Sequence, residues 1–351
     1  MRFENVHIEA MSHVLPPTRV SSAALEDRLS PLYRRLGLPE GRLELMTGIR
    51  ERRFWTPGTA PSAVAAEAGK RVLATAGIDP EQVDCVLYCG VSRDAVEPAT
   101  SAEVHRLLGL PGHAINFDIS NACLGVLSGM VVAAGMIERG ALSRGLLVTG
   151  EVARPLVEST VRELNGNETL TRQSVKPHFA SLSIGSGAAA VLLAAKDVAA
   201  NGRGRLLGGA SWSETHHNSL CRGGEANTGG PTGQVLMATD SEELLVRGVD
   251  VARRAWDQTR EELNWTNETP DLVCTHQVGK AHTAKLFDEL GLDIEKNVAT
   301  FPYLGNCGSA SLPMTASVAA AEGRLKAGDV LALLGIGSGI NCTMLGVEWT
   351  E

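Results

Sequence analysis

The sequence is poor in aromatic residues, since Phe, Trp and Tyr make up only 4% of its 351 residues. Hydrophobic residues still account for 44% of the chain, so its core must be built mainly from small and aliphatic side chains. The 38 glycines and recurrent Ala-rich runs fit closely packed helices and sheets better than disorder. The chain is long enough for a substantial core, in two domains or in one large one.

Long apolar runs and basic clusters are also missing. No window approaches the roughly 18 uninterrupted apolar residues of a membrane-spanning helix, and the nearest, residues 124–140, meets charge at Glu138 and Arg139. The N-terminal MRFENVHIEAMSHV alternates like a strand and lacks the cationic start and apolar centre of a signal peptide. A net charge of −8 gives no electrostatic reason to expect a nucleic-acid partner.

The cysteines form no disulfide framework. They are odd in number and scattered, and five lie within apolar runs, where reduced thiols pack well. The seven are Cys85, Cys89, Cys123, Cys221, Cys274, Cys307 and Cys342. This distribution favours a cytoplasmic protein without structural disulfides.

What the sequence does contain is one order of elements used twice. Strand-like and helix-like segments alternate in each half, which predicts an α/β architecture with buried sheets. In the first half these segments are residues 83–92, 100–110, 113–119, 120–139, 145–152 and 185–196. In the second half they are residues 271–278, 282–292, 297–305, 306–325, 329–339 and 340–349. The repetition predicts two similar halves, residues 1–200 and 201–351.

The polar, Gly-rich residues 214–234, ETHHNSLCRGGEANTGGPTGQ, predict a long loop or lid at one face. His216 and His217 in this stretch do not predict a metal site, because adjacent histidines without a third ligand are more often loop residues. GSGAAAV, residues 185–191, is similar to a dinucleotide-binding loop but leads into a strand-like run rather than a helix, which argues against that use.

Cys123 lies in FDISNACLGVLSGM, where a strand-like run meets a helix-like run. At a helix N-terminus, unpaired N–H groups and the macrodipole lower a thiol pKa and can bind an oxyanion. A lone cysteine in an apolar run is nevertheless usually an inert core residue. Asn121 and the small residues that follow favour a capped, closely packed helix without establishing catalysis.

Two positions in the second half strengthen the catalytic interpretation. His276, in VCTHQVGKAHT, ends the first strand of the repeat, where side chains project into sites. Asn306, in YLGNCGSASLP, occupies the place in the repeat that Cys123 occupies in the first half. A buried histidine alone is usually a satisfied core residue, but Cys, His and Asn placed in this way are harder to explain by packing.

These three motifs resemble those of the ketoacyl synthase III-like branch of the thiolase superfamily, as do TGIRERRFW (47–55) and LLGIGSGINCTM (333–344). The motifs follow the family's order across nearly the whole chain. The resemblance implies a five-layered αβαβα fold, usually in a homodimer. It also implies that an acyl thioester acylates Cys123, that His276 and Asn306 stabilise the enolate of the second substrate, and that the N–H groups of Cys123 and Ser338 form an oxyanion hole.

SRDAVEPATSA (92–102) and ETHHNSLCRG (214–223) are similar to segments of the OleA-type subgroup, which condenses two fatty acyl-CoAs head to head. Ordinary members obtain their carbanion by decarboxylation, whereas joining two acyl chains requires a base that removes an α-proton. An arbitrary loop glutamate is usually just an exposed acid. In this subgroup, the resemblance implies that Glu97 is the base, that it reaches into the partner subunit's site, and that the product is a 2-alkyl-3-ketoacid for long-chain olefin biosynthesis.

Substrate contacts are less clearly marked. The decarboxylating enzymes usually carry Trp and Arg shortly before TGIR for the CoA nucleotide, and Arg42 and Met46 stand at those places here. Arg50 and Arg222 are candidate substrate-binding residues, and Arg52 and Arg53 are further candidates for phosphate contact, although RERR equally fits a solvated face. We expect acyl-CoA or acyl-carrier-protein thioesters as substrates, with no cofactor, no metal and no integral membrane segment.

Three alternatives stay open. The first is a decarboxylating 3-oxoacyl-carrier-protein synthase III of fatty-acid synthesis, against which Glu97 argues. The second is an acyltransferase of the same fold that moves the acyl group to oxygen or nitrogen, which acceptor assays would separate. The third is a non-catalytic thiolase-fold subunit, which has no need of the complete set Cys123, His276 and Asn306.

Overall fold

Ten strands form one continuous hydrogen-bonded sheet in the order β12-β11-β13-β14-β8-β1-β7-β6-β4-β5. The computed structural model describes residues 1–199, 202–224 and 235–350. Five strands come from the first part of the chain: β1 (Val6–Val14), β4 (Cys85–Tyr88), β5 (Ile115–Asp118), β6 (Arg144–Glu151) and β7 (Gly187–Ala195). Five come from the second: β8 (Gly204–Ser213), β11 (Leu272–Thr275), β12 (Asn297–Val298), β13 (Val330–Gly337) and β14 (Asn341–Trp349).

The two sets of five strands have the same topology. In the first set, β4 pairs parallel with β5 and β6, while β7 pairs antiparallel with β6 and β1. In the second, β11 pairs parallel with β12 and β13, while β14 pairs antiparallel with β13 and β8. The sets are joined where β1 pairs antiparallel with β8, with His7 and Ile8 opposite Arg205 and Gly204. The repeat predicted from the sequence is confirmed at the level of strand order and direction.

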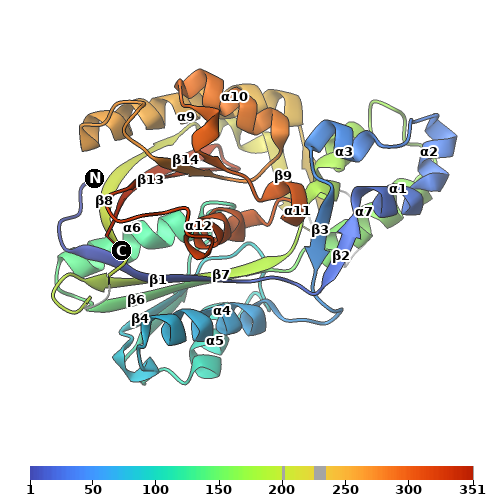
Figure 1. Ribbon diagram of the computed structural model, residues 1–351. Helices are drawn as coiled ribbons and strands as arrows, with labels where there is room; N and C mark the ends of the chain where they lie inside the picture. The colour runs from blue at the N-terminus through green and yellow to red at the C-terminus, as the bar shows by residue number, and fades with distance from the viewer. Residues whose placement is uncertain (200–201, 225–234, 351) are drawn as a thin grey trace.

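The strand layers enclose two central helices, α6 (Gly125–Glu138) and α12 (Ser311–Ala321), as Figure 1 shows. Outer helices α4 (Pro61–Ala76) and α5 (Thr100–Leu108) cover the first strand layer, and α9 (Ser241–Leu263) and α10 (Lys280–Leu290) cover the second. The result is the predicted five-layered αβαβα arrangement.

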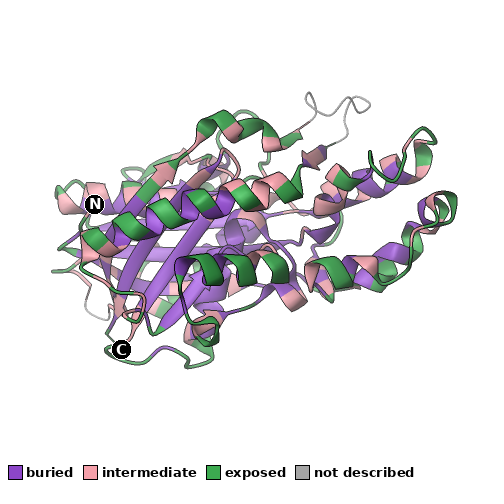
Figure 2. Cartoon of the chain, turned by 90° about the horizontal axis from the view of Figure 1, so that it is seen from above, coloured by how far each residue is buried: buried purple, intermediate pink, exposed green. Residues whose placement is uncertain are grey.

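Side-chain size explains which helices lie in the centre. Gly129 of α6 packs so closely that an added Cβ would lie 2.7 Å from the Cys89 sulfur and from Leu147. Every residue from Ser311 to Ala319 in α12 is buried. Outer helices instead expose one polar face, visible as the green outward stripes in Figure 2. The runs of small residues in the sequence therefore form the helices that are covered on both sides.

A smaller group of elements packs beside the layers, at the right of Figure 1. It contains β2 (Thr18–Ser21), β3 (Glu51–Phe54), α1 (Ser22–Arg28), α2 (Ser30–Leu36), α3 (Arg42–Thr47), α7 (Arg154–Gly166) and α8 (Lys176–Phe179). The hairpin β9 (Cys221–Gly224) and β10 (Leu236–Thr239) contacts α7 and α8. Short helices complete the chain: η1 (Pro80–Gln82), η2 (Ala180–Ser183), η3 (Thr215–Leu220), η4 (Ile294–Lys296), α11 (Phe301–Leu304) and η5 (Gly308–Ala310).

Two sequence expectations need adjustment. The helix expected from Ser120 begins only at Gly125, so Cys123 precedes it. The expected loop or lid at 214–234 contains η3 and β9, while residues 225–234 lie outside the described residues.

All seven cysteines are free thiols. No helix within the described ranges is long and apolar enough to cross a membrane.

Candidate active site

The predicted nucleophile lies on a sharp turn between β5 and α6. Ala122 has a φ of 44°, which a residue with a Cβ seldom adopts. Leu124 caps α6, and its N–H donates to the Asn121 carbonyl at 2.8 Å. Cys123 is half-buried at the tip of this turn. Backbone conformation, rather than helix membership, therefore sets the direction of the thiol.

Amide side chains join the Cys123 turn to the start of β14, which follows the turn after β13. Asn341 Nδ2 donates to Asn121 Oδ1 at 3.1 Å, and Asn121 Nδ2 donates to Ser128 Oγ at 2.9 Å. Gly337 lies against the turn, because a Cβ there would be 3.4 Å from the Cys123 nitrogen. Ser338 follows Gly337 directly, so the structure brings the two predicted oxyanion-hole residues into one small region.

His276 follows β11, and backbone and side-chain bonds fix its position. The backbone N–H of His276 donates to the Leu334 carbonyl at 3.1 Å, which joins this residue to β13. Gln277 Oε1 accepts the N–H groups of Thr300 and Phe301 at 2.9 and 3.1 Å. These bonds fix the turn that carries His276, whose side chain is buried.

Burial, helped by the nearby His282, lowers the pKa of His276 to about 4, so its imidazole is neutral at pH 7. Its Nδ1 is buried and has no hydrogen-bond partner among the described residues. A buried nitrogen lone pair without a partner costs less free energy than a buried N–H without one. Nδ1 is therefore the unprotonated nitrogen, and the proton is on Nε2. Nε2–H is then free to donate to a substrate oxygen.

This neutral histidine predicts a pH-dependent stability. In the folded protein its pKa lies below the ordinary histidine value of 6.5, so the unfolded chain binds the proton more tightly. The stabilisation is complete above pH 6.5 and is lost as the pH falls toward 4. Between these values, the free energy of unfolding of the wild type should fall by roughly 3 kcal/mol more than that of His276→Asn. Urea titrations at a series of pH values measure this; parallel curves for the two proteins would contradict it.

Asn306 lies just before η5 and α12, and its side chain is oriented by two donors. Gly308 N–H donates to Oδ1 at 3.0 Å, and Ser311 Oγ donates to it at 3.4 Å. Its backbone bonds Ser183 and Gly185 at 3.0 and 2.8 Å. With Oδ1 engaged, Nδ2 has no partner among the described residues and remains a free donor.

The Cys123 thiol does not have the lowered pKa expected at a helix start. Burial raises its pKa to about 12, with the carboxylate of Glu151 and the thiol of Cys221 adding to the effect. The expectation was wrong because Cys123 lies two residues ahead of α6 and close to a negative charge. The Cys123 sulfur is therefore protonated at pH 7.

Glu97 is not brought together with the other three residues within the chain. It lies in the loop between β4 and α5, and residues 93–99 are all exposed. Val96, beside it, is 98% exposed, which is unusual for a valine. The Glu97 side chain is therefore accessible from outside the chain.

The arginines predicted to meet phosphates separate into two groups. Arg50 and Arg222 are exposed and stay candidates. Arg52 is 1% exposed and donates to Ser22 Oγ at 3.0 Å, so it is a structural residue. Arg53 donates to the Pro16 carbonyl at 3.2 Å. Phosphate contact by Arg52 is a wrong prediction, because the alternation along β3 turns that side chain inward.

Glu151, at the end of β6, is a residue that the sequence analysis missed. It is 5% exposed and accepts hydrogen bonds from the main chain of Val91, Ser92 and Ser309. The signal was available, since an acidic residue closes an otherwise apolar run in GLLVTGEV.

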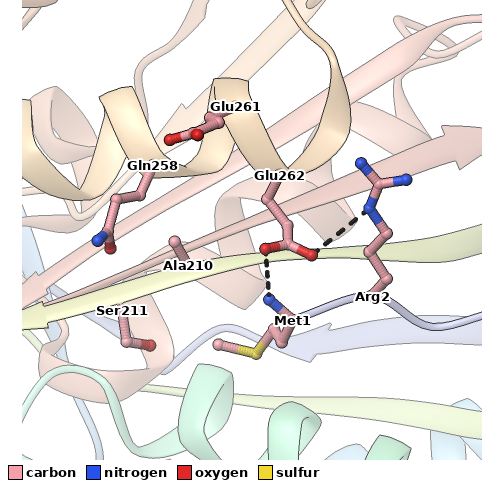
Figure 3. Close-up of a pocket in the computed structure, with 7 residues that line it drawn as sticks. All are labelled: Met1, Arg2, Ala210, Ser211, Gln258, Glu261 and Glu262. Carbon is pink, nitrogen blue, oxygen red and sulfur yellow. Dashed lines mark ion pairs between the residues drawn. The ribbon is translucent and has the colours of Figure 1, made fainter.

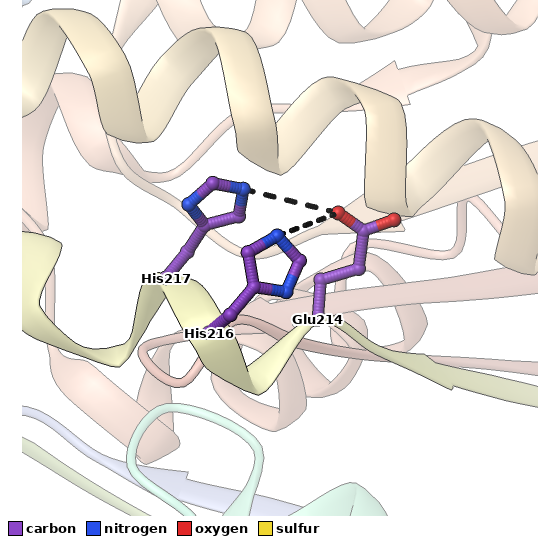
Figure 4. A group of neighbouring side chains, drawn as sticks. All are labelled: Glu214, His216 and His217. Atoms are coloured by element: carbon purple, nitrogen blue, oxygen red, sulfur yellow. Dashed lines mark ion pairs between the residues drawn. The ribbon is translucent and has the colours of Figure 1, made fainter.

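A third possible metal ligand does accompany the two adjacent histidines. Glu214 Oε2 lies 4.0 Å from Nε2 of both His216 and His217, and the three side chains point toward one another (Figure 4). The other carboxylate oxygen pairs with Arg254 Nε at 3.5 Å. The premise that a third ligand is lacking was wrong, but this carboxylate already has a cationic partner without a metal ion.

A hollow between β8, α9 and the N-terminus contains none of the predicted catalytic residues (Figure 3). There the N-terminal ammonium pairs with Glu262 at 3.3 Å, as does Arg2 at 3.4 Å. The residues lining it are Met1, Arg2, Ala210, Ser211, Gln258, Glu261 and Glu262. No cysteine or histidine is among these residues, so this hollow lacks the thiol and imidazole of the predicted site.

Comparison with known families gives matches over most of the chain. The family model described as 3-oxoacyl-[acyl-carrier-protein (ACP)] synthase III matches residues 117–208, and its C-terminal model matches residues 260–349. The model described as thiolase, N-terminal domain, matches residues 45–156.

Two curated proteins are similar over their full lengths. An acyl-CoA:acyl-CoA alkyltransferase of Shewanella oneidensis is 39% identical over 99% of this chain and 100% of its own. A protein of the same description from Xanthomonas campestris is 36% identical, again over 99% of this chain and 100% of its own.

Solved structures of Xanthomonas campestris OleA match with a TM-score of 0.93 at 36% identity. The cerulenin-bound structure is covered over 98% of its chain, and a variant with bound lauric acid and lauroyl-CoA over 100%; both cover 99% of this chain. Other structures of that enzyme carry substitutions of one cysteine, one glutamate or one histidine.

Proposed function

Because this chain belongs to the thiolase-fold family of acyl-CoA:acyl-CoA alkyltransferases, the OleA family, we propose that it joins two fatty acyl-CoA molecules by non-decarboxylative Claisen condensation. The residue assignment rests on one observation: the four residues follow the carboxyl ends of strands that correspond to one another in the two halves. Glu97 follows β4 and His276 follows its counterpart β11; Cys123 follows β5 and Asn306 follows its counterpart β12. Carboxyl ends of parallel strands share one edge, where ligands bind.

In the first half-reaction, Cys123 Sγ attacks the carbonyl carbon of an acyl-CoA. The carbon–sulfur bond to CoA breaks, and the thiol proton leaves with the CoA thiol, so an acyl-Cys123 remains. The N–H groups of Cys123 and Ser338 stabilise the oxyanion formed on the way. Gly337 leaves room for that oxygen, since no Cβ stands beside the Cys123 nitrogen.

In the second half-reaction, a base removes the α-proton of another acyl-CoA. The enolate oxygen accepts hydrogen bonds from His276 Nε2 and Asn306 Nδ2, both held ready as donors. The α-carbon attacks the acyl-Cys123 carbonyl, and the thiolate leaves. The product is a 2-alkyl-3-ketoacyl-CoA, and hydrolysis by water gives the 2-alkyl-3-ketoacid.

We assign the base to Glu97 of a second subunit in a homodimer. Its exposure within one subunit supports a role across an interface, as does the exposed Val96 beside it. Ile115, on the edge strand β5, is also 45% exposed. A carboxylate that reaches the partner's acyl-CoA would be shielded from water there, which favours proton abstraction.

Acyl-CoA is the proposed donor, in keeping with the lauroyl-CoA bound to the related OleA. Arg50 and Arg222 are the proposed contacts for its phosphates. Leu45 and Met46 expose their side chains on α3, 86% and 52% respectively, close along the chain to Arg50. They offer an apolar surface in place of the Trp and Arg of decarboxylating enzymes. Cytoplasmic location, where acyl-CoA and free thiols coexist, completes the proposal.

The test is incubation of the enzyme with a long-chain acyl-CoA alone. We expect release of CoA and formation of the 2-alkyl-3-ketoacid, or of the ketone that remains after it loses carbon dioxide. Thiol titration measures CoA, and mass spectrometry measures the product. Malonyl-carrier-protein is the control substrate: condensation that requires it would establish the decarboxylating alternative instead.

A further inference from the structure

Glu151 connects three segments of the active site through one carboxylate. Its Oε2 accepts the N–H of Ser92 at 3.0 Å, and its Oε1 accepts the N–H groups of Val91 at 2.9 Å and Ser309 at 3.3 Å. The Ser309 hydroxyl lies 2.8 Å from Oε1. The three N–H groups can only donate, which favours an ionised carboxylate. The Ser309 hydroxyl has one proton and also lies 2.6 Å from the Cys89 carbonyl, so it joins Glu151 to the end of β4 as well.

The partners of Glu151 are the supports of residues already assigned to the reaction. Val91 and Ser92 begin the loop that leads to Glu97. Ser309 belongs to η5, which follows Asn306, and Gly308 between them approaches the carboxylate so closely that a Cβ would lie 3.3 Å from it. Gly308 also has a φ of 54°, so this contact depends on glycine at that position.

In the repeat, the end of β6, where Glu151 lies, corresponds to the end of β13, which is followed by Ser338. Glu151 closes β6, and β13, the counterpart of β6, ends at Gly337 directly before Ser338. Both ends therefore belong to the edge where Cys123 lies. The carboxylate has no Lys, Arg or His partner among the described residues, although it is 5% exposed. Burying a negative charge that is stabilised only by N–H and O–H dipoles lowers the stability of the fold. Such a residue is therefore a candidate for a functional role.

We propose that Glu151 is a positioning residue of the condensation, a role that rests on the proposed function. Its carboxylate holds the Glu97 loop and the Asn306 segment in fixed positions relative to each other. It also maintains a negative charge beside Cys123. Burial of the thiol disfavours a free thiolate and the charge of Glu151 adds to that effect, so Cys123 stays protonated until an acyl-CoA occupies the site. The thiol proton then leaves with CoA as the acyl group arrives. The same charge protects the waiting thiol from oxidants and stray electrophiles, because those react with the thiolate.

The test is the pH dependence of Cys123 alkylation by iodoacetamide in Glu151→Gln. Removal of the charge should lower the pKa of the Cys123 thiol by about one unit, which makes alkylation at pH 8 up to about tenfold faster than in the wild type. Peptide mass spectrometry follows Cys123 and separates it from Cys221, the other partly exposed cysteine. Condensation of acyl-CoA by the same variant should fall at least about tenfold, through kcat rather than KM, because the supporting segments loosen.

Three control variants separate charge from shape. Ser309→Ala keeps the carboxylate and should leave the alkylation profile at its wild-type position while lowering kcat several-fold. Glu151→Asp also keeps the charge and should preserve slow alkylation, and it serves if the glutamine variant does not fold. Glu158→Gln removes an acid of the same type that pairs with Arg154 on α7, and it should change neither property.

An unchanged alkylation profile in folded Glu151→Gln would overturn the role of the charge, and unchanged kcat would overturn the positioning role. Alkylation needs no second substrate, so its result stands even if the enzyme proves to use a different acyl acceptor. Absence of condensation in the wild type, by contrast, would count against the proposed function alone.

Discussion

Glu97→Gln is expected to form acyl-Cys123 at nearly the wild-type rate yet to condense two acyl-CoAs about 10²–10⁴-fold more slowly. Glutamine keeps the size of the side chain but cannot accept the α-proton. Glu97 makes no contact with Cys123 in its own chain, so acylation has no need of it. Intact-protein mass spectrometry measures the acyl adduct, and product formation measures condensation. A normal rate of condensation would remove Glu97 from the mechanism.

Mixed dimers make this prediction sharper. If Glu97 acts on the partner's site, a dimer of one Glu97→Gln chain and one Cys123→Ala chain contains one complete site. Random exchange between the two inactive variants should then restore about a quarter of wild-type activity. If Glu97 acted within its own chain, the mixture would stay inactive. The matched control is a mixture of Cys123→Ala with His276→Asn. One of the two sites in each mixed dimer would be free of both substitutions only if Cys123 and His276 came from different chains. Because each chain supplies its own Cys and His, we expect no recovery.

The sequence was most informative where chemistry and topology coincide. Cys123, His276 and Asn306 can be predicted as a set because their motifs resemble those of one family and each follows a strand of a repeated unit. The ends of such strands meet at one edge of a sheet. Their orientation was beyond the sequence. Nothing in YLGNCGSASLP states that Gly308 and Ser311 engage the Asn306 oxygen and so leave its nitrogen free.

Errors arose where a local pattern was overridden by packing. The thiol pKa of Cys123 was expected to be lowered by a helix, but burial and Glu151, distant in sequence, raise it. Arg52 looked like part of a solvated or phosphate-binding run, yet the period of β3 directs it into the protein. Glu214 joins His216 and His217 because η3 bends the chain back, which residue composition does not reveal.

Asn306→Asp is expected to retain acylation and the fold but to lose condensation by about 10²–10³-fold or more. Aspartate has the same shape, and one of its oxygens can still accept from Gly308 N–H and Ser311 Oγ. Its second oxygen replaces the Nδ2 donor, so an enolate oxygen meets a negative charge instead of a hydrogen bond. The defect should therefore appear in kcat for condensation and not in the rate at which Cys123 is acylated.

Ser311→Ala provides the matched control for this substitution. It removes the weaker of the two bonds that orient Asn306, at 3.4 Å, and the bond from the Cys307 N–H to Ser311 Oγ at 2.8 Å, while Nδ2 stays in place. We expect only a several-fold loss of condensation, because Gly308 N–H still holds Oδ1. Equal losses in Asn306→Asp and Ser311→Ala would mean that the segment as a whole, and not the Nδ2 donor, limits the reaction. A large loss confined to the aspartate variant assigns the enolate to Asn306, acting together with the neutral His276.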